Sequence, residues 1–161
     1  MKTIYLIRHA KSGWEIEGIP DIDRPLNQRG YTDAHEMSER LKEKKIKPDL
    51  VICSPAVRTT TTALIFCRKL GYDPSKISFK EKLYHTNYRD YLKVIQEIDE
   101  KYEVAFLYGH NPLISECAQA LVPSIVGEMS TCGVIAIENK KWADFKPGNG
   151  NLVFEDFPKN G

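Results

Sequence analysis

The sequence predicts an α/β fold: a single three-layer domain over residues 1–161, with a mostly parallel central sheet flanked by helices. Short apolar runs typical of buried strands alternate with amphipathic helical patterns, and this order favours parallel βαβ units. The length of 161 residues and the hydrophobic fraction of 42% suit one core of ordinary size. No repeat, low-complexity tract or linker divides the chain. We therefore expect one domain.

Charge and composition exclude several classes of function. The formal net charge is +1 with basic and acidic residues interspersed, so neither a nucleic-acid face nor an anionic-membrane anchor is expected. Arg8 and His9 interrupt the apolar run near the N-terminus, and no run approaches the ~20 residues of a membrane span. We therefore expect no signal peptide and no transmembrane helix. Scattered cysteines without CxxC spacing are expected as buried apolar side chains in a reducing cytoplasm. They are Cys53, Cys67, Cys117 and Cys132.

The first third of the chain has the pattern strand, loop, helix, strand. Thr3–Ile7 is predicted as a buried strand. Residues 11–26 contain two glycines and two prolines, which favour an irregular loop, and its length is typical of a functional segment. Asn27 is predicted to cap a helix that ends near Lys44–Lys45, where cations suit the helix dipole. Asp49–Cys53 is the second predicted strand.

The middle of the chain repeats this order. Ser54 and Pro55 are predicted as the N-cap and first-turn residue of a helix that stops at Gly71. Ile77–Phe79 is predicted as a short edge strand. Asn87 is predicted to cap a strongly amphipathic helix.

The last part of the chain completes the predicted sheet. Val104–Tyr108 is apolar throughout, as expected of a central strand covered on both faces. Asn111 and Pro112 are then predicted as the cap and first residue of a helix. The remaining predicted strands are residues 132–138 and a hairpin formed by residues 142–145 and 152–154.

Polar residues directly follow three of these strands. Arg8 and His9 follow the first, Ser54 follows the second with Arg58 close behind it, and His110 follows the central strand. Carboxyl ends of parallel strands meet at one edge of a sheet, so these side chains should converge. Two arginines and two histidines are favourable together mainly when an anion neutralises them, and a guanidinium matches phosphate oxygens in a bidentate way. The sequence thus predicts a phosphate site.

Arg58 and His110 each have a structural alternative. Arg58 would lie in the first turn of a helix, where a cation opposes the dipole by about 0.3–1 kcal/mol unless an anion or a carboxylate partner lies beside it. His110 precedes a helix N-terminus, where a histidine serves either structure or anion binding. The chain has no GxxxxGK[ST] loop and no carboxylates at metal-ligand spacing. A P-loop nucleotide site and a metal site are therefore not expected.

Three segments resemble the motifs of the histidine phosphatase superfamily. RHAKSGW (Arg8–Trp14) is similar to its RHG motif with alanine in place of the glycine, SPAVRTTTTA (Ser54–Ala63) to its SPxxRxxxTA segment, and GHNP (Gly109–Pro112) to its third motif. DRPLNQRG (Asp23–Gly30), LYH (Leu83–His85) and the short length resemble the SixA-type phosphohistidine phosphatase branch. The resemblance covers nearly the whole chain and implies a phosphoglycerate mutase-like fold.

This resemblance implies a role for each matching residue. His9 would be the nucleophile, forming a covalent phosphohistidine that water then hydrolyses. The residues implied to contact the phosphoryl group are Arg8, Arg58 and His110 as its clamp, and Ser12 and Arg24 as further phosphate contacts. The implied activity uses no metal and no cofactor. Its implied partner is a protein carrying phosphohistidine or a small phosphorylated substrate.

The chemistry of these residue types agrees with such roles. A histidine attacks phosphorus only when one ring nitrogen has a free lone pair. Nearby arginines disfavour imidazolium, so we expect His9 to be neutral at pH 7, with its other nitrogen donating to a backbone carbonyl. His110 would serve best as imidazolium once phosphate is bound, which gives the two histidines opposite roles.

The chain departs from the wider superfamily where mutases and most alcohol-ester phosphatases carry an acidic general acid. After its EKL segment stand Tyr84 and His85, with Glu81 just upstream. An alkoxide leaving group needs a proton, whereas a phosphorylated imidazole leaves more readily, so phosphohistidine is favoured and His85 or Glu81 stays open as a proton donor. The absence of long insertions predicts a shallow, open site. A small-molecule phosphatase or mutase and a non-catalytic phosphoprotein-binding module are the alternatives.

Overall fold

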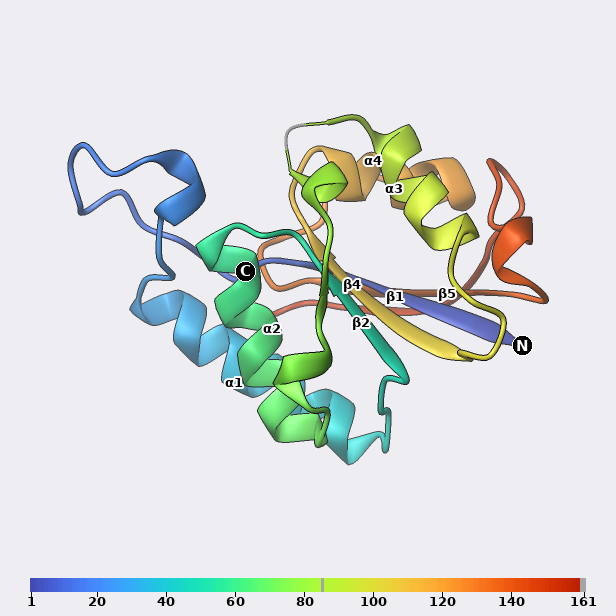
Figure 1. Cartoon of the computed structure of the whole chain (residues 1–161), viewed down its shortest axis with the longest axis horizontal. Helices are drawn as coiled ribbons and strands as arrows, with labels where there is room; N and C mark the ends of the chain where they lie inside the picture. Colours follow the sequence, from blue (N-terminus) through green and yellow to red (C-terminus); the bar gives the residue numbers. More distant parts are fainter. Residues whose placement is uncertain (85, 160–161) are drawn as a thin grey trace.

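The computed structural model describes residues 1–84 and 86–159. It forms one six-stranded sheet with helices α1 and α2 on one face and α3 and α4 on the other (Figure 1). The helices are α1 (Gln28–Glu43), α2 (Val57–Leu70), α3 (Tyr88–Gln96) and α4 (Leu113–Leu121). The strands are β1 (Lys2–Arg8), β2 (Leu50–Cys53), β3 (Ser78–Phe79), β4 (Val104–Gly109), β5 (Val134–Asn139) and β6 (Asn151–Asp156). The predicted three-layer α/β fold is confirmed.

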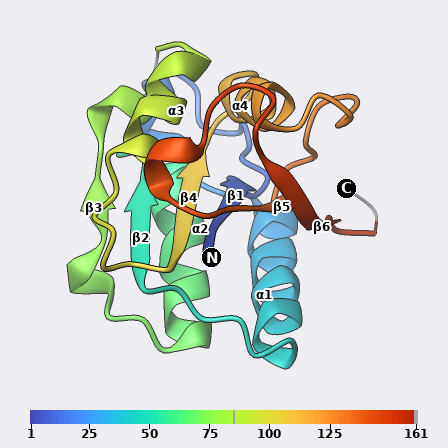
Figure 2. The same ribbon diagram turned by 90° about the vertical axis from the view of Figure 1, so that its right-hand side faces the viewer.

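The strand order explains how distant segments meet. The order is β3-β2-β4-β1-β5-β6 (Figure 2). Strands β1 to β4 pair in parallel, and β5 runs antiparallel to both β1 and β6, so the sheet is mostly parallel as predicted. Arg8 pairs with Gly109, and Cys53 pairs with Tyr108. The carboxyl ends of β1, β2 and β4 therefore lie side by side at one edge.

Alternate residues of the central strands supply two cores. Leu6 and Leu107 belong to the cluster with α3 and α4, whereas Ile7 and Tyr108 belong to the cluster with α1 and α2. Because both faces are covered, both sets are fully buried, and the strands have no polar face. Each such side chain contributes about 1.5–3 kcal/mol through burial.

Two of the four predicted helix caps are confirmed and two are wrong. The side chain of Asn27 accepts a hydrogen bond from the Gly30 N–H and that of Asn87 from the Arg89 N–H, as predicted. Helix α2 instead has Ala56 as its N-cap, and α4 has Pro112 in that position. The side chains of Ser54 and Asn111 are used in tertiary contacts at the sheet edge, described below.

The predicted hairpin of residues 142–145 with residues 152–154 is wrong. Trp142–Asp144 forms a short 3-10 helix (η4), and β6 pairs with β5. Trp142 is fully buried, stacks on Phe145 at a centroid distance of 5.4 Å, and donates from Nε1 to the Tyr102 carbonyl at 2.8 Å. Burial of two aromatic rings at the edge of the core therefore outweighs strand pairing in this segment.

The four cysteines are free and buried, as predicted. Burial raises the pKa of Cys53 and of Cys67 to about 12, so these thiols stay neutral and unreactive at neutral pH. Among the helices of residues 1–84 and 86–159, none combines the length and apolarity needed to cross a membrane.

Candidate active site

The predicted residues converge at the carboxyl edge of the sheet. A cavity of about 330 Å³ lies there. The predicted site residues that line it are Arg8, His9, Ser12, Arg24, Arg58 and His110. Two arginines and two histidines thus meet as expected, and a third arginine joins them.

His9 directly follows β1 and is held in one tautomer. Its backbone N–H donates to the Gly109 carbonyl at 3.1 Å, which fixes the main chain between β1 and β4. Its Nδ1 lies 2.7 Å from the Ala10 carbonyl oxygen. Because a carbonyl oxygen only accepts, Nδ1 carries the proton and Nε2 keeps its lone pair. The predicted hydrogen bond to a backbone carbonyl is confirmed.

The surroundings of His9 keep its imidazole neutral. Its pKa is lowered to about 4, chiefly by burial and also by the positive charges of Arg58, Arg8 and Arg24, while the Ala10 carbonyl acts in the opposite direction and favours protonation. The sequence predicted the influence of the arginines, but burial is the larger cause. At pH 7 the imidazole of His9 is therefore neutral.

Ala10 and Thr62 join the first two sequence motifs. Ala10, which stands where the superfamily motif has glycine, is fully buried, and its N–H donates to Thr62 Oγ1 at 3.0 Å. The same hydroxyl donates to the Arg58 carbonyl at 2.7 Å. This threonine therefore connects the end of β1 to the first turns of α2, where Arg58 is buried.

Arg8 and Arg58 both line the cavity and are held in place by protein oxygens. Arg8 donates from one terminal nitrogen to the Met129 carbonyl at 2.9 Å. Arg58 donates to the backbone oxygen of Asp21 at 2.8 Å and to its carboxylate at 3.0 Å. Within the described residues, the buried Nε atoms of Arg8 and Arg58 have no protein hydrogen-bond partner. Because a guanidinium carries several N–H donors, these two side chains can bind an oxyanion in the cavity that they line.

Asp21 is the carboxylate partner of Arg58 that the structural alternative for this residue predicts. It begins the short 3-10 helix η1 (Asp21–Asp23) in the loop after β1. Its Oδ2 accepts from Arg58 and, at 2.7 Å, from the Tyr84 hydroxyl, and its Oδ1 lies 3.2 Å from Arg24 Nε. Burial raises the pKa of Asp21, but Tyr84 and Arg58 outweigh it and hold that pKa below its ordinary value. Arg58 is thus both paired with a carboxylate and exposed to the cavity.

Two hydroxyl groups position His110, one at its ring and one at its backbone. Its Nε2 lies 2.8 Å from Ser54 Oγ, which explains why Ser54 does not cap α2. Its backbone N–H donates to the Tyr91 hydroxyl at 3.1 Å, and that hydroxyl donates to the Leu83 carbonyl. The Tyr91 ring comes so close that a Cβ on Gly109 would lie 2.5 Å from its oxygen, so only glycine fits there. The rings of His9 and His110 face the same cavity with centroids 5.3 Å apart.

The loop after β1 completes the cavity wall. Ser12 pairs with Leu26 in an isolated bridge that closes this loop at its base. The Arg24 guanidinium lies 3.6 Å above the ring centroid of Trp14, which is 72% exposed. Arg24 is itself buried, so Trp14 and Arg24 form a fixed rim of the cavity.

Sequence reasoning missed three residues of the cavity wall. They are Trp14, Asn111 and Thr131. Trp14 and Asn111 lie inside motifs that the sequence analysis quoted, whereas Thr131 has no local signal. Asn111, predicted as a cap, donates to the same Met129 carbonyl as Arg8, at 2.9 Å, and accepts from Ser115.

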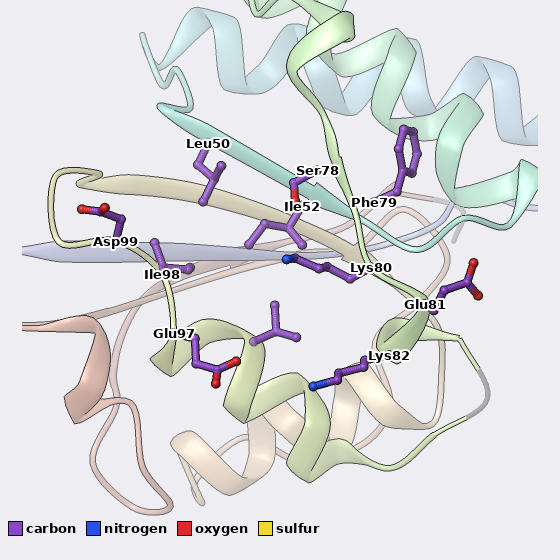
Figure 3. Close-up of a pocket in the computed structure, with 11 residues that line it drawn as sticks. Leu50, Ile52, Ser78, Phe79, Lys80, Glu81, Lys82, Glu97, Ile98 and Asp99 are labelled. Carbon is purple, nitrogen blue, oxygen red and sulfur yellow. The ribbon is translucent and has the colours of Figure 1, made fainter.

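No carboxylate lines this cavity among the described residues. Glu81, one candidate proton donor, starts the 3-10 helix η3 (Glu81–Leu83) and lines a separate cavity of about 430 Å³ beside β2 and β3 (Figure 3). His85, the other candidate, lies outside the described residues. Within residues 1–84 and 86–159, no group of three or more His, Cys, Asp or Glu side chains is arranged to hold a metal ion.

The fold and this cavity define a class of protein. A family model of the histidine phosphatase superfamily (branch 1) matches residues 4–116, so the chain belongs to that superfamily. The predicted phosphoglycerate mutase-like fold is thereby confirmed, and the chain is a phosphatase.

Particular relatives agree with this assignment. A solved structure from Agrobacterium tumefaciens, assigned as the phosphohistidine phosphatase SixA, has a TM-score of 0.81 with 26% identity over 98% of both chains. A protein histidine phosphatase SixA complexed with tungstate has a TM-score of 0.84 with 20% identity, again over 98% of both chains. An uncharacterized Mycobacterium tuberculosis protein is 28% identical over 95% of this chain and 100% of its own length.

Proposed function

We propose that this protein is a phosphohistidine phosphatase that acts on proteins, without a metal ion, through a covalent phosphohistidine at His9. The observation that carries the proposal is the state of His9. A neutral imidazole with its proton held on Nδ1 leaves Nε2 free to attack, inside a cavity lined by three arginines. Positioning and charge stabilisation are what phosphoryl transfer needs most.

The proposed reaction has two displacements at phosphorus. In the first, the lone pair of His9 Nε2 forms a bond to phosphorus while the bond from phosphorus to the substrate nitrogen breaks. The departing imidazole keeps that electron pair and takes a proton from solvent. In the second, the oxygen of a water molecule forms a bond to phosphorus while the bond from phosphorus to His9 Nε2 breaks. Nε2 keeps that electron pair, the water gives up one proton to solvent, and inorganic phosphate is released. Arg8, Arg58 and His110 stabilise the charge on the phosphoryl oxygens in both steps.

The lack of a carboxylate in the cavity supports phosphohistidine over alkyl phosphates. An alkoxide is a poor leaving group and needs a general acid, whereas an imidazole is a good one. Among the described residues, no carboxylate lines the phosphate cavity, and Glu81 lines another cavity. The likeness to the Agrobacterium tumefaciens structure that is assigned as the phosphohistidine phosphatase SixA supports the same substrate class.

Trapping the intermediate tests the proposal. Incubation with ³²P-labelled phosphoramidate should yield a phosphoenzyme that is labile in acid and stable in alkali, and it should be absent from a His9→Ala variant. Full turnover by His9→Ala would refute the proposed nucleophile. EDTA should leave the rate unchanged, and a loss of activity that Mg²⁺ or Zn²⁺ restores would refute metal independence.

Substrate comparison tests the leaving group. Phosphate release from a phosphohistidine peptide should exceed release from an alkyl phosphate such as 3-phosphoglycerate by at least a hundredfold in kcat/KM. The reverse order would favour a small-molecule phosphatase or mutase. Tight binding of the phosphopeptide with no release of phosphate would instead favour a binding module.

A further inference from the structure

A second cavity adjoins the phosphate cavity. Its volume is about 280 Å³, and it shares Arg58, His110 and Asn111 with the first cavity. The two cavities are therefore neighbours, with these three residues in the wall of both. A group bonded to a phosphorus in the first cavity could reach into the second.

The rest of the second cavity differs in chemistry from the first. Its other described lining residues are Tyr84, Thr86, Pro112 and Leu113, none of them charged. The first cavity has Lys11 and three arginines, whereas among the described residues Arg58 is the one lysine or arginine that lines the second. The first thus suits a dianion and the second an uncharged ring with polar nitrogens.

The aromatic wall of the second cavity is fixed in place. The ring of Tyr84 meets the ring of His110 edge to face, at a centroid distance of 5.5 Å and an interplanar angle of 66°. Its hydroxyl donates to Asp21 Oδ2 at 2.7 Å, and the same carboxylate binds Arg58. Asp21 therefore sets the Tyr84 ring and the Arg58 guanidinium relative to one another.

We propose that this second cavity is a leaving-group subsite that holds the imidazole ring of the substrate phosphohistidine against Tyr84 and Leu113. The proposal rests on the proposed function and adds the residues that select the ring. Stacking and edge-to-face contacts between aromatic rings supply the selectivity.

Two phosphodonors separate ring recognition from phosphoryl transfer. N-phosphoimidazole and phosphoramidate both carry a phosphorus–nitrogen bond, but only the first has a ring. The measured quantity is the ratio of kcat/KM for N-phosphoimidazole to that for phosphoramidate. We expect Tyr84→Ala to lower this ratio about tenfold and Leu113→Ala to lower it several-fold, whereas Tyr84→Phe, which keeps the ring, retains it. Phe79→Ala, in the separate cavity of Figure 3, is the matched control and should leave the ratio unchanged.

The outcomes distinguish this proposal from the proposed function. If phosphoramidate labels His9 but Tyr84→Ala and Leu113→Ala keep the wild-type ratio, the subsite is refuted and the phosphatase mechanism stands. Binding gives a readout that needs no turnover. Imidazole added to the phosphate-bound protein should shift the methyl resonances of Leu113 in NMR spectra, and Tyr84→Ala should weaken this response. A shift at neither Leu113 nor Tyr84 would refute the subsite, even for a folded protein that fails to turn over.

Discussion

At the scale of single residues, His9 shows how a weak base becomes a useful nucleophile. Its pKa is lowered to about 4 because burial and three arginines oppose the imidazolium, and the Ala10 carbonyl selects the tautomer. A histidine with an ordinary pKa near 6.5 would be partly protonated at neutral pH. Keeping the lone pair of Nε2 free therefore makes the folded protein less stable at low pH.

This linkage predicts a specific dependence of stability on pH. The unfolded chain binds a proton at His9 below about pH 6.5, whereas the native state resists protonation until about pH 4. Above pH 6.5 the ring is neutral in both states, and His9 has no effect on the pH dependence of stability. As the pH falls from 6.5 to 4, the unfolded state alone binds the proton, and the free energy of unfolding falls by up to about 3 kcal/mol. Urea denaturation at several pH values, in buffers without phosphate or sulfate, measures it.

A His9→Gln variant is the control for that experiment. It keeps a donor for the Ala10 carbonyl but has no titrating ring. Between pH 7 and pH 4 its free energy of unfolding should fall less than that of the wild type. Parallel curves for the two proteins would contradict the lowered pKa. In the wild type, the NMR signals of His9 should titrate near pH 4.

At the scale of elements, the carboxylate of Asp21 connects the loop after β1 to two other segments of the chain. Asp21 joins η1 to Arg58 of α2 and to Tyr84 beyond η3. The loop thereby covers one side of the cavity while its base is closed by the bridge between Ser12 and Leu26. Loss of this carboxylate should loosen Arg58 and the loop together.

Asp21→Asn should therefore lower kcat/KM for a phosphohistidine peptide about tenfold. An amide keeps one acceptor oxygen but not the charge, and a hydrogen bond to a charged group is worth about 1.5–3 kcal/mol. Amide hydrogen exchange in residues 12–25 should also become faster. Asp23→Asn is the matched control, since Asp23 is exposed in the same turn and should change kcat/KM less than twofold. Equal effects of the two substitutions would contradict a special role of Asp21.

Gly30 is a second point where elements meet closely. A Cβ there would lie 2.1 Å from the backbone oxygen of Lys11, so α1 and the loop after β1 approach to backbone contact. Helix propensity alone predicts that Gly30→Ala stabilises α1 by about 1 kcal/mol. Because a backbone atom cannot move aside cheaply, we expect the opposite.

Gly30→Ala should lower the free energy of unfolding by about 1–3 kcal/mol in urea denaturation. It should also reduce kcat/KM, because Lys11 follows His9 by two residues and lines the cavity. Gln28→Ala, at an exposed position of the same helix, controls for helix propensity and should change stability by less than about 0.5 kcal/mol. A stabilised Gly30→Ala variant would contradict the close approach.

At the scale of the whole molecule, the phosphate cavity and the buried side chain of Trp142 lie at opposite ends of the sheet. The cavity is at the carboxyl edge of β1 and β4, whereas Trp142 contacts Tyr102, which precedes β4, near the start of β1. Trp142 and Lys2 both donate to the Tyr102 carbonyl, which connects η4 to the beginning of β1. Changes there should affect folding without reaching the phosphate cavity.

Trp142→Phe should therefore destabilise the protein and spare its activity. It removes the Nε1–H donor and part of a fully buried ring, at a cost of about 1–3 kcal/mol in the free energy of unfolding. At 25 °C, kcat/KM of the folded variant should equal that of the wild type. A large loss of kcat/KM with full folding by circular dichroism would contradict this separation.

Much of the fold and of the cavity was predictable because the signals are local. The apolar strands, the caps Asn27 and Asn87, and the polar residues after three strands all follow from short stretches of sequence. The failures are residues whose neighbours lie far along the chain. Ser54 forms a hydrogen bond with His110, and Asn111 donates to the Met129 carbonyl. The aromatic side chains of Trp142 and Phe145 stack and pack into the core.

The sequence by itself determined the α/β class, the alternation of strands and helices from β1 to β5, and which basic side chains follow β1, β2 and β4. Adjacent residues carry this information, because hydrophobic periodicity and capping act within one element. Only the tertiary structure decided that Asp21 joins Arg58 to Tyr84, that burial leads the lowering of the His9 pKa, and that a second cavity adjoins the phosphate cavity. These properties depend on which surfaces pack together, and packing is settled by the free energy of the whole chain rather than by any one segment.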